Sequence, residues 1–250
     1  MVVREDRGPV TILRLAHGRA NALDPEVLRA LGDAVAAAAA RAVVLTGDGA
    51  MFSAGVDLKR LAAGGPDYPG ALLPALADCF ARLFYHPRPV VAAVNGHAIA
   101  GGCVLACAAD RRLAARGVAR IGVTELLVGV PFPAIALEIM RSVAGPGHFA
   151  EMVYGGRTVS VDEAARRRLV DEVVEPAALV DAAVAEAQTL AAIPPATFAL
   201  TKAQARQPTR DFLAVHAARI DREVARCWRA PEAQAAIRRY VAATLGAGRA

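Results

Sequence analysis

The 250-residue sequence has few of the residues that characterise disulfide-rich, metal-binding or nucleic-acid-binding proteins. Its four cysteines, Cys79, Cys103, Cys107 and Cys227, do not have the spacing of a disulfide framework, and no cluster of histidines accompanies them. Aromatic residues make up only 5% of the chain and do not alternate with basic ones. We therefore expect buried free thiols, no metal site and no nucleic-acid partner.

The sequence also lacks a long apolar run. A membrane-spanning helix needs about 20 apolar residues, whereas the longest runs, such as residues 34–40, are short alanine-rich segments. Near the N-terminus, Glu5 and Asp6 stand where a signal peptide would have a basic region and then an apolar core. We therefore predict a cytoplasmic protein with no membrane segment, and the length fits one large domain with or without an appendage.

Lysine is scarce, although the chain is basic. The net charge of +5 comes from 27 arginines and only two lysines, Lys59 and Lys202. A positive net charge is compatible with an anionic ligand, with nucleic acid or with no specific partner. Lys202 falls in the C-terminal part of the chain, where we expect a surface lysine rather than a phosphate ligand.

Two glycine-bearing segments are the most informative feature that is present. Residues 52–58 (Phe-Ser-Ala-Gly-Val-Asp-Leu) follow the apolar run 42–45, and residues 95–103 (Asn-Gly-His-Ala-Ile-Ala-Gly-Gly-Cys) follow the apolar run 89–94. Glycine at a strand-to-helix turn lets backbone N–H groups point into a cavity. Either segment alone is compatible with an ordinary tight turn. Two such turns brought together would offer two donors to one oxygen atom, which is an oxyanion hole.

The pattern of apolar residues, caps and breakers predicts alternating strands and helices up to about residue 175 and helices alone after it. Strands are expected at 8–15, 42–45, 90–94, 111–115, within 121–130 and at 170–174. Helices are expected at 24–40, from about 56, at 72–84, 101–109 and 147–155, after Ser160, and at 177–192, 195–207, 209–228 and 231–245. The Gly- and Pro-rich residues 63–70 are expected to form a loop.

This pattern predicts an α/β core over residues 1–192 and a helical region over residues 193–250. Alternation of strands and helices would equally suit a Rossmann-like sheet. However, no Gly-x-Gly-x-x-Gly follows a first strand, which counts against a dinucleotide-binding fold.

Taken together, the two glycine segments resemble those of the crotonase, or enoyl-CoA hydratase/isomerase, superfamily. The resemblance begins near residues 21–23, continues through residues 122–129 and ends near the C-terminus. It implies a spiral of ββα units with C-terminal helices that mediate trimer formation, and thus a homotrimer or a dimer of trimers. It also implies an acyl-CoA substrate, with coenzyme A entering as part of the substrate and no separate cofactor.

The resemblance further implies specific site residues. The oxyanion-hole donors fall on the backbone N–H groups of Val56 and Gly101, and the catalytic carboxylate falls on Glu125. Other residues at positions that contact the substrate in this family are Ala22, Ala54, Asp57, Lys59 and Gly102.

The acid–base residues indicate the reaction. Enoyl-CoA hydratases of this family use two glutamates, of which one matches Glu125 and the other falls on Val104, which cannot transfer a proton. One glutamate suits proton transfer without water addition, as in the Δ3,Δ2-enoyl-CoA isomerases. The segments 100–105 and 231–240 also look more isomerase-like than hydratase-like.

Two alternatives remain open at this point. Glu138, in the segment 131–138, can restore hydration if it faces the cavity, although a glutamate there more often pairs at a helix surface. A non-catalytic acyl-CoA-binding protein is the other alternative. In both cases Lys59 and Arg60 follow the first glycine turn, where relatives often place a basic side chain near the CoA phosphates.

Overall fold

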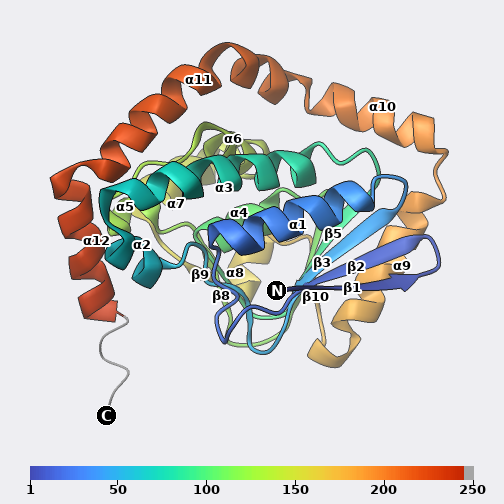
Figure 1. Cartoon of the computed structure of the whole chain (residues 1–250). Coiled ribbons are helices and arrows are strands. Elements are labelled where there is room, and N and C mark those ends of the chain that lie inside the picture. The colour runs from blue at the N-terminus through green and yellow to red at the C-terminus, as the bar shows by residue number, and fades with distance from the viewer. Residues whose placement is uncertain (245–250) are drawn as a thin grey trace.

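Two β-sheets carry the fold of residues 1–244, the part of the chain that the computed structural model describes (Figure 1). The larger sheet has the order β1-β2-β3-β5-β7-β10, and only its β1–β2 pair is antiparallel. Its strands are β1 (Val2–Arg7), β2 (Val10–Leu15), β3 (Ala42–Gly47), β5 (Val90–Val94), β7 (Arg111–Ala115) and β10 (Glu172–Val174).

The smaller sheet has the order β4-β6-β8-β9. Its strands are β4 (Met51–Ser53), β6 (His97–Ile99), β8 (Arg120–Gly122) and β9 (Val159–Ser160). The chain repeatedly adds one strand to the larger sheet, then one to the smaller sheet, and then forms a helix. β3, β4 and α2, β5, β6 and α4, and β7, β8 and α5 are three such repeats. This arrangement is the predicted spiral of ββα units.

Twelve α-helices complete the described part of the chain. They are α1 (Pro25–Ala37), α2 (Leu58–Gly64), α3 (Tyr68–Phe84), α4 (Gly101–Cys107), α5 (Glu125–Val128), α6 (Ala134–Val143), α7 (Pro146–Gly155), α8 (Val161–Arg166), α9 (Leu179–Ala191), α10 (Pro195–Ala205), α11 (Gln207–Arg229) and α12 (Pro231–Thr244). Helices α1 and α8 each begin with a side-chain cap. The Asp24 carboxylate accepts from the Val27 amide at 2.8 Å, and the Ser160 hydroxyl accepts from the Glu163 amide at 3.2 Å.

The larger sheet is buried on both faces. Helices α1 and α3 cover one face, where the main apolar core lies, and α9 covers the other (Figure 1). On the α9 face, Val44 and Val91 pack with Leu179 and Ala183. Because strands buried on both faces are apolar throughout, β3 and β5 were predictable as continuous hydrophobic runs.

Three expectations about local structure were wrong. β1 was missed because it is an exposed edge strand, and the strand expected at 8–15 begins at Val10. Residues 63–70 form no loop, since α2 continues to Gly64, a 3-10 turn follows and α3 begins at Tyr68. Proline within a first helical turn is compatible with the helix, which explains why Pro69 does not delay its start. Helix α6 and the short strands β4, β6 and β9 were also not among the expected elements.

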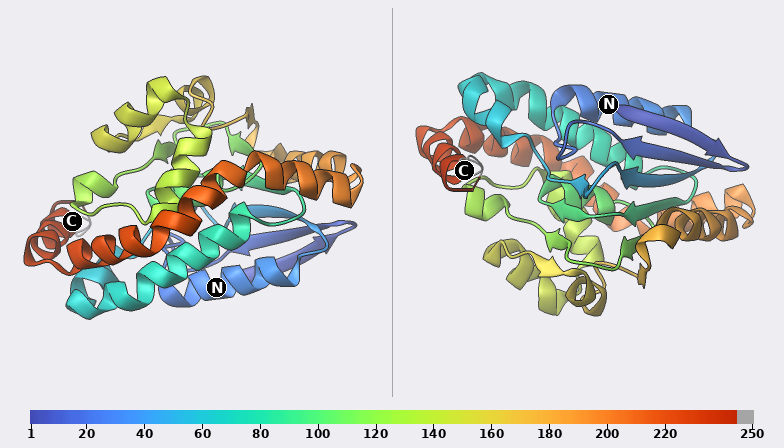
Figure 2. Two further views of the ribbon diagram at one scale, coloured as in Figure 1. Left: turned by 90° about the horizontal axis from the view of Figure 1, so that it is seen from above. Right: turned by 90° about the horizontal axis from the view of Figure 1, so that it is seen from below.

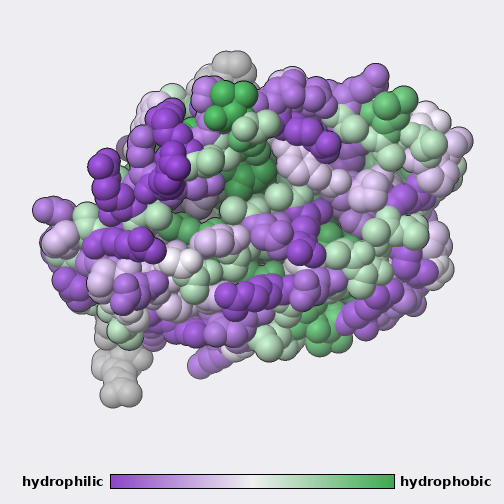
Figure 3. Space-filling view, turned by 45° about the horizontal axis from the view of Figure 1, so that its top comes forward, coloured by the Kyte–Doolittle hydropathy of each residue, from purple (hydrophilic) through white to green (hydrophobic). Residues whose placement is uncertain are grey.

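The C-terminal helices run across the outside of the core. In Figure 2, α11 lies across α3 and α6, and in Figure 1 α12 descends beside α2 and α5. The face shown in Figure 3 mixes hydrophilic and apolar side chains, and the apolar Leu200 and Val215 of α10 and α11 are 63% and 73% exposed. Of the helix expected at 231–245, residue 245 lies outside the described residues.

No single helix within residues 1–244 combines the length and the apolarity that a membrane crossing requires. Segments 176–191 and 195–205, which meet at a bend of 100°, satisfy both criteria only as a pair.

Candidate active site

A cavity of about 580 Å³ opens between the core and the C-terminal helices. Exposed Arg19 and Lys59 are among its lining residues, and buried apolar side chains from α3, α5 and α11 contribute much of the wall, among them Phe80, Val128 and Trp228. Among residues 1–244, no group of three or more His, Cys, Asp or Glu side chains is placed to hold a metal ion.

The two glycine turns meet at this cavity. Gly55 has φ 78°, and a Cβ on it would lie 2.7 Å from the Ile99 carbonyl oxygen and 3.0 Å from the Gly101 nitrogen. Only glycine fits such a close approach at a positive φ. The turns that the sequence separates by about 45 residues are therefore in direct contact.

Both predicted donors line the cavity and have no protein acceptor within residues 1–244. The Leu23 amide donates to the Gly55 carbonyl at 2.8 Å and the Asp57 amide donates to the Leu23 carbonyl at 3.0 Å, which leaves the intervening Val56 amide unused. Gly101 is the first residue of α4, so its amide has no intrahelical acceptor. Two backbone N–H groups without a protein acceptor thus lie at the same cavity.

Gly102 does not line the cavity. A Cβ at this position would lie 2.3 Å from the Ser53 carbonyl oxygen, so the glycine allows α4 to pack closely on β4. The predicted substrate contact at Gly102 is therefore corrected to a packing role.

Glu125, the first residue of α5, lines the cavity as a nearly isolated carboxylate. Its Oε2 atom exposes less than 1 Å² and has no hydrogen-bond partner within residues 1–244. Burial raises the pKa of Glu125 to about 7, although its own amide and that of Thr124 act to lower it. A carboxyl group with this pKa can both accept and donate a proton near neutral pH.

Neither of the two positions considered for a second catalytic carboxylate, residues 104 and 138, lines the cavity. Val104 is fully buried in the core of the protein and does not line the cavity. Glu138 is also buried, but it pairs with Arg141 at 3.0 Å, and Ala136, two residues earlier in α6, is the residue that faces the cavity. Residues two apart lie on different faces of a helix, so the alternative in which Glu138 supplies a second carboxylate is wrong.

The other predicted contact residues, Ala22, Ala54, Asp57 and Lys59, all line the cavity. The Asp57 carboxylate accepts from the Arg60 amide at 3.0 Å and so caps α2. Asp57 is therefore the second carboxylate at the cavity, and one of its oxygens, Oδ1, accepts the capping hydrogen bond.

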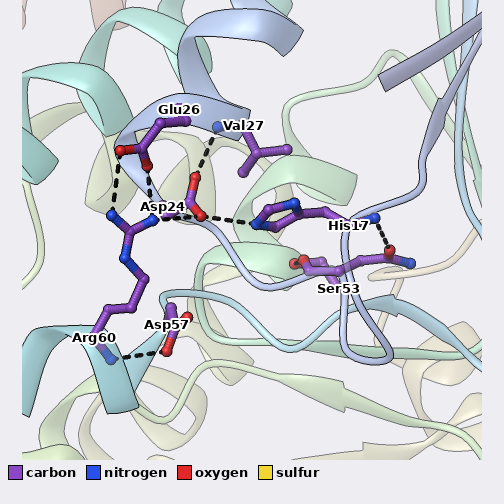
Figure 4. Close-up of polar contacts among 8 residues, drawn as sticks. His17, Asp24, Glu26, Val27, Ser53, Asp57 and Arg60 are labelled. Atoms are coloured by element: carbon purple, nitrogen blue, oxygen red, sulfur yellow. Dashed lines mark hydrogen bonds and ion pairs between the residues drawn. The ribbon is translucent and has the colours of Figure 1, made fainter. Parts of the chain in front are cut away.

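Arg60 does not line the cavity. Its guanidinium donates to Asp24 and to Glu26, each at 2.8 Å (Figure 4). His17 lies on the other side of Asp24, with its Nε2 2.8 Å from the carboxylate. Burial acts to raise the pKa of Asp24, but hydrogen bonds from Val27 and His17 hold it below the usual value. Arg60 thus fixes α2 to α1, and the cations that line the cavity are Arg19 and Lys59.

Sequence reasoning missed several residues of the lining. His17 and Arg19 precede the segment where the resemblance begins, and their only signal is a basic pair around Gly18. Trp228 comes from α11, and its indole N–H donates to the Pro131 carbonyl at 2.9 Å. A single tryptophan far along the chain carries no local signal of such a contact.

Comparison with known proteins identifies the same family. A model of the enoyl-CoA hydratase/isomerase family matches residues 7–241. A putative enoyl-CoA hydratase of Thermus thermophilus is 35% identical over 209 residues, which cover 80% of this chain and 82% of that protein. The short-chain-enoyl-CoA hydratase of Clostridium acetobutylicum is 30% identical over 208 residues, covering 80% and 79%.

Solved structures agree with the fold. Human mitochondrial Δ3,Δ2-enoyl-CoA isomerase has a TM-score of 0.92 at 25% identity and covers 99% of both chains. An enoyl-CoA hydratase/isomerase family protein of Pseudomonas syringae has a TM-score of 0.82 at 28% identity, covering 89% of this chain and 96% of that one. With its two juxtaposed turns and its buried glutamate, this chain belongs to the enoyl-CoA hydratase/isomerase family.

Proposed function

We propose that this enzyme isomerises the double bond of an enoyl-CoA from the Δ3 to the Δ2 position, with Glu125 as the only acid–base residue. The observation that carries the proposal is the number of free carboxylates. Of the two that line the cavity within residues 1–244, Asp57 caps α2, and Glu125 alone has a buried, unpartnered oxygen.

In this mechanism Glu125 takes a proton from C2 of the substrate. The electron pair of the broken C–H bond spreads over C2, C4 and the thioester oxygen, where the Val56 and Gly101 amides donate hydrogen bonds. Protonated Glu125 then returns the proton to C4, which leaves the double bond between C2 and C3 and regenerates the carboxylate. A pKa of about 7 suits a group that must act first as base and then as acid. Each backbone donor of this kind is typically worth about 3–4 kcal/mol of transition-state stabilisation.

The apolar lining supports the same proposal. Val104 occupies the position of the second glutamate, and a predominantly apolar lining offers few partners for the water molecule that two glutamates would hold. Phe80, Pro133 and Trp228 line the part of the cavity where an acyl chain would fit. The curated relatives named above are hydratases, so hydration is the second candidate and must be measured in the same experiment.

The test uses 3-hexenoyl-CoA and, separately, crotonyl-CoA. Double-bond migration is followed by absorbance and water addition by mass spectrometry. We expect migration without hydration. Efficient hydration of crotonyl-CoA would contradict the proposal, and binding of CoA esters with neither reaction would favour a non-catalytic acyl-CoA-binding protein.

We also propose that the enzyme is a homotrimer or a dimer of trimers. The exposed apolar side chains on α10 and α11, Leu200 and Val215, support subunit contacts through the C-terminal helices. Light scattering coupled to size-exclusion chromatography measures the mass in solution, and a monomer across the micromolar range would contradict this assembly.

A further inference from the structure

A second cavity, of about 500 Å³, shares no lining residue with the first. It lies between the end of α4, strand β7 and helices α10 and α11. Its chemistry differs from that of the first cavity, because charged side chains contribute much of its wall. Nothing in the proposed isomerase mechanism uses it.

Cations outnumber carboxylates in this wall. Four basic residues and two acidic residues line the cavity: Arg112, Arg168, Lys202, Arg206, Asp110 and Asp171. Lining charges that sum to about two positive units attract anions into a cavity of low dielectric.

Three of the cations are buried. The side chains of Lys202, Arg112 and Arg206 are only 8%, 10% and 12% exposed. The expectation that Lys202 is a surface lysine was therefore wrong. Burial of a charge is costly unless the charge is paired and hydrogen-bonded, so the partners of these three cations decide what the cavity can do.

The two carboxylates pair with these cations but do not satisfy them all. Lys202 and Arg206 share Asp110, each at 2.7 Å, and the Val90 amide also donates to that carboxylate at 2.8 Å. Arg112 donates to Asp171 at 2.9 Å. Asp110 thus serves two cations and an amide, and little of its acceptor capacity remains.

Several donors in the cluster are left over. Arg112 Nε and Arg206 Nη1 are buried and have no acceptor within residues 1–244. Arg168 is exposed at the cavity and forms no ion pair in the described part of the chain. Burial lowers the pKa of Lys202 to about 8 and also lowers that of Arg206, in spite of the attraction of Asp110. The charge of the cluster is therefore incompletely compensated.

We propose that the second cavity is a binding site for an oxyanion, supplied either as free phosphate or as a carboxylate of a second copy of this chain. Guanidinium groups match the geometry of such oxyanions, and their hydrogen bonds to an anion are charge-assisted. An oxyanion here would compensate the surplus charge and give the leftover donors an acceptor.

The first arm of the test is a titration with inorganic phosphate at constant ionic strength, followed by isothermal calorimetry and by the shift in melting temperature. A ligand that binds only the folded state raises that temperature in a saturable manner. Arg168→Asn should weaken the apparent affinity about tenfold, since it removes a charged donor. Asparagine tolerates the positive φ of 62° at this position, so the backbone is not an additional variable.

Two matched variants control for charge in general. Arg29→Gln removes an exposed cation that lines neither cavity, and Lys59→Gln removes one of the exposed cations that line the first cavity. Both should leave the phosphate affinity of the second cavity unchanged. Lys202→Met, checked for folding by circular dichroism, should weaken the affinity at least as much as Arg168→Asn.

The second arm distinguishes the two sources of the oxyanion. If phosphate does not bind but the wild-type protein is oligomeric and Arg168→Asn and Lys202→Met lower its mass by light scattering, the oxyanion is a carboxylate of a second copy. If neither phosphate affinity nor mass depends on Arg168 and Lys202, the proposal is wrong.

Discussion

The two cavities differ in whether their buried charged groups have partners. In the first, one carboxylate, Glu125, stands among apolar side chains with a free oxygen. In the second, Asp110 pairs with Lys202 and Arg206, Asp171 pairs with Arg112, and cations are in excess.

Burial acts on both sites in the same direction, toward the neutral form of the charged group. It raises the pKa of Glu125 to about 7 and lowers that of Lys202 to about 8. The difference lies in the partners. An unpaired group becomes a proton carrier near neutral pH, whereas a cluster of paired groups holds its charge, stabilises the fold and attracts an anion.

The largest expected effect is on proton transfer in the first cavity. Glu125→Gln has nearly the same shape but cannot accept a proton, so exchange of the C2 proton should fall by about 10³-fold or more. Exchange is measured as deuterium incorporation into the acyl-CoA, and binding by calorimetry should persist. Asp57→Asn is the matched control, because it alters the other carboxylate at this cavity and should leave exchange within a few-fold. Unchanged exchange in the glutamine variant would eliminate Glu125 as the base.

A substitution at the second cavity should instead lower the free energy of unfolding. Asp110→Asn leaves Lys202 and Arg206 buried without their shared carboxylate, and removal of one partner of a buried pair typically costs about 3–5 kcal/mol. Unfolding in urea measures the loss. Asp78→Asn, which breaks the exposed pair with Arg82, should cost at most about 1 kcal/mol.

Adding phosphate gives a second comparison between the Asp110→Asn variant and the wild-type protein. Because Asp110→Asn increases the surplus of positive charge, phosphate should stabilise the variant more than the wild-type protein. Equal stabilities of the Asp110 and Asp78 variants would show that the buried cluster is not held by its ion pairs.

The first cavity was largely predictable from the sequence, and the second was not. Gly55, Gly101 and Glu125 lie in short local motifs, and each motif folds into a strand-to-helix turn whose shape its own residues determine. Their meeting could be expected because the same family pattern contains both turns. The structure adds that Gly102 serves packing and that Glu138 faces away from the cavity.

The second cavity depends on residues that share no motif. Asp110 and Lys202 are 92 positions apart, and neither has a neighbour that indicates an ion pair. Arg206 joins them only because the junction of α10 and α11 lies beside residues 108–110, which follow α4. Pairing of this kind is set by the packing of segments distant in sequence, so the lysine in α10 was expected at the surface.

Backbone geometry also distinguishes the two cavities. The proposed donors in the first cavity are backbone N–H groups, whereas those in the second are side chains. Gly55→Ala would place a Cβ 3.0 Å from the Gly101 nitrogen and should lower the isomerisation rate about 10²–10³-fold through the lost donor geometry. Gly65→Ala is the control, because Gly65 also has a positive φ but open space around it. Phosphate binding should be the same in both variants, and similar isomerase rates would refute the assignment of the two turns as donors.

The smallest expected effect is the pH dependence of the isomerisation rate and of the stability, which both depend on Glu125. Glu125 must be deprotonated to act, so the rate at low substrate should rise about tenfold per pH unit below pH 7 and level off above it. Stability should change in the opposite direction. The folded state holds this proton more tightly than the unfolded chain, so stability falls as the pH rises from about 4.5 to about 7, by at most about 3 kcal/mol.

Glu125→Gln has no such proton to lose. The difference in unfolding free energy between wild type and variant should therefore vary with pH across this interval and become constant above it. A constant difference from pH 4 to pH 8 would mean that the carboxylate titrates normally, and a carboxylate of normal pKa would be a weaker base toward the C2 proton than this mechanism requires.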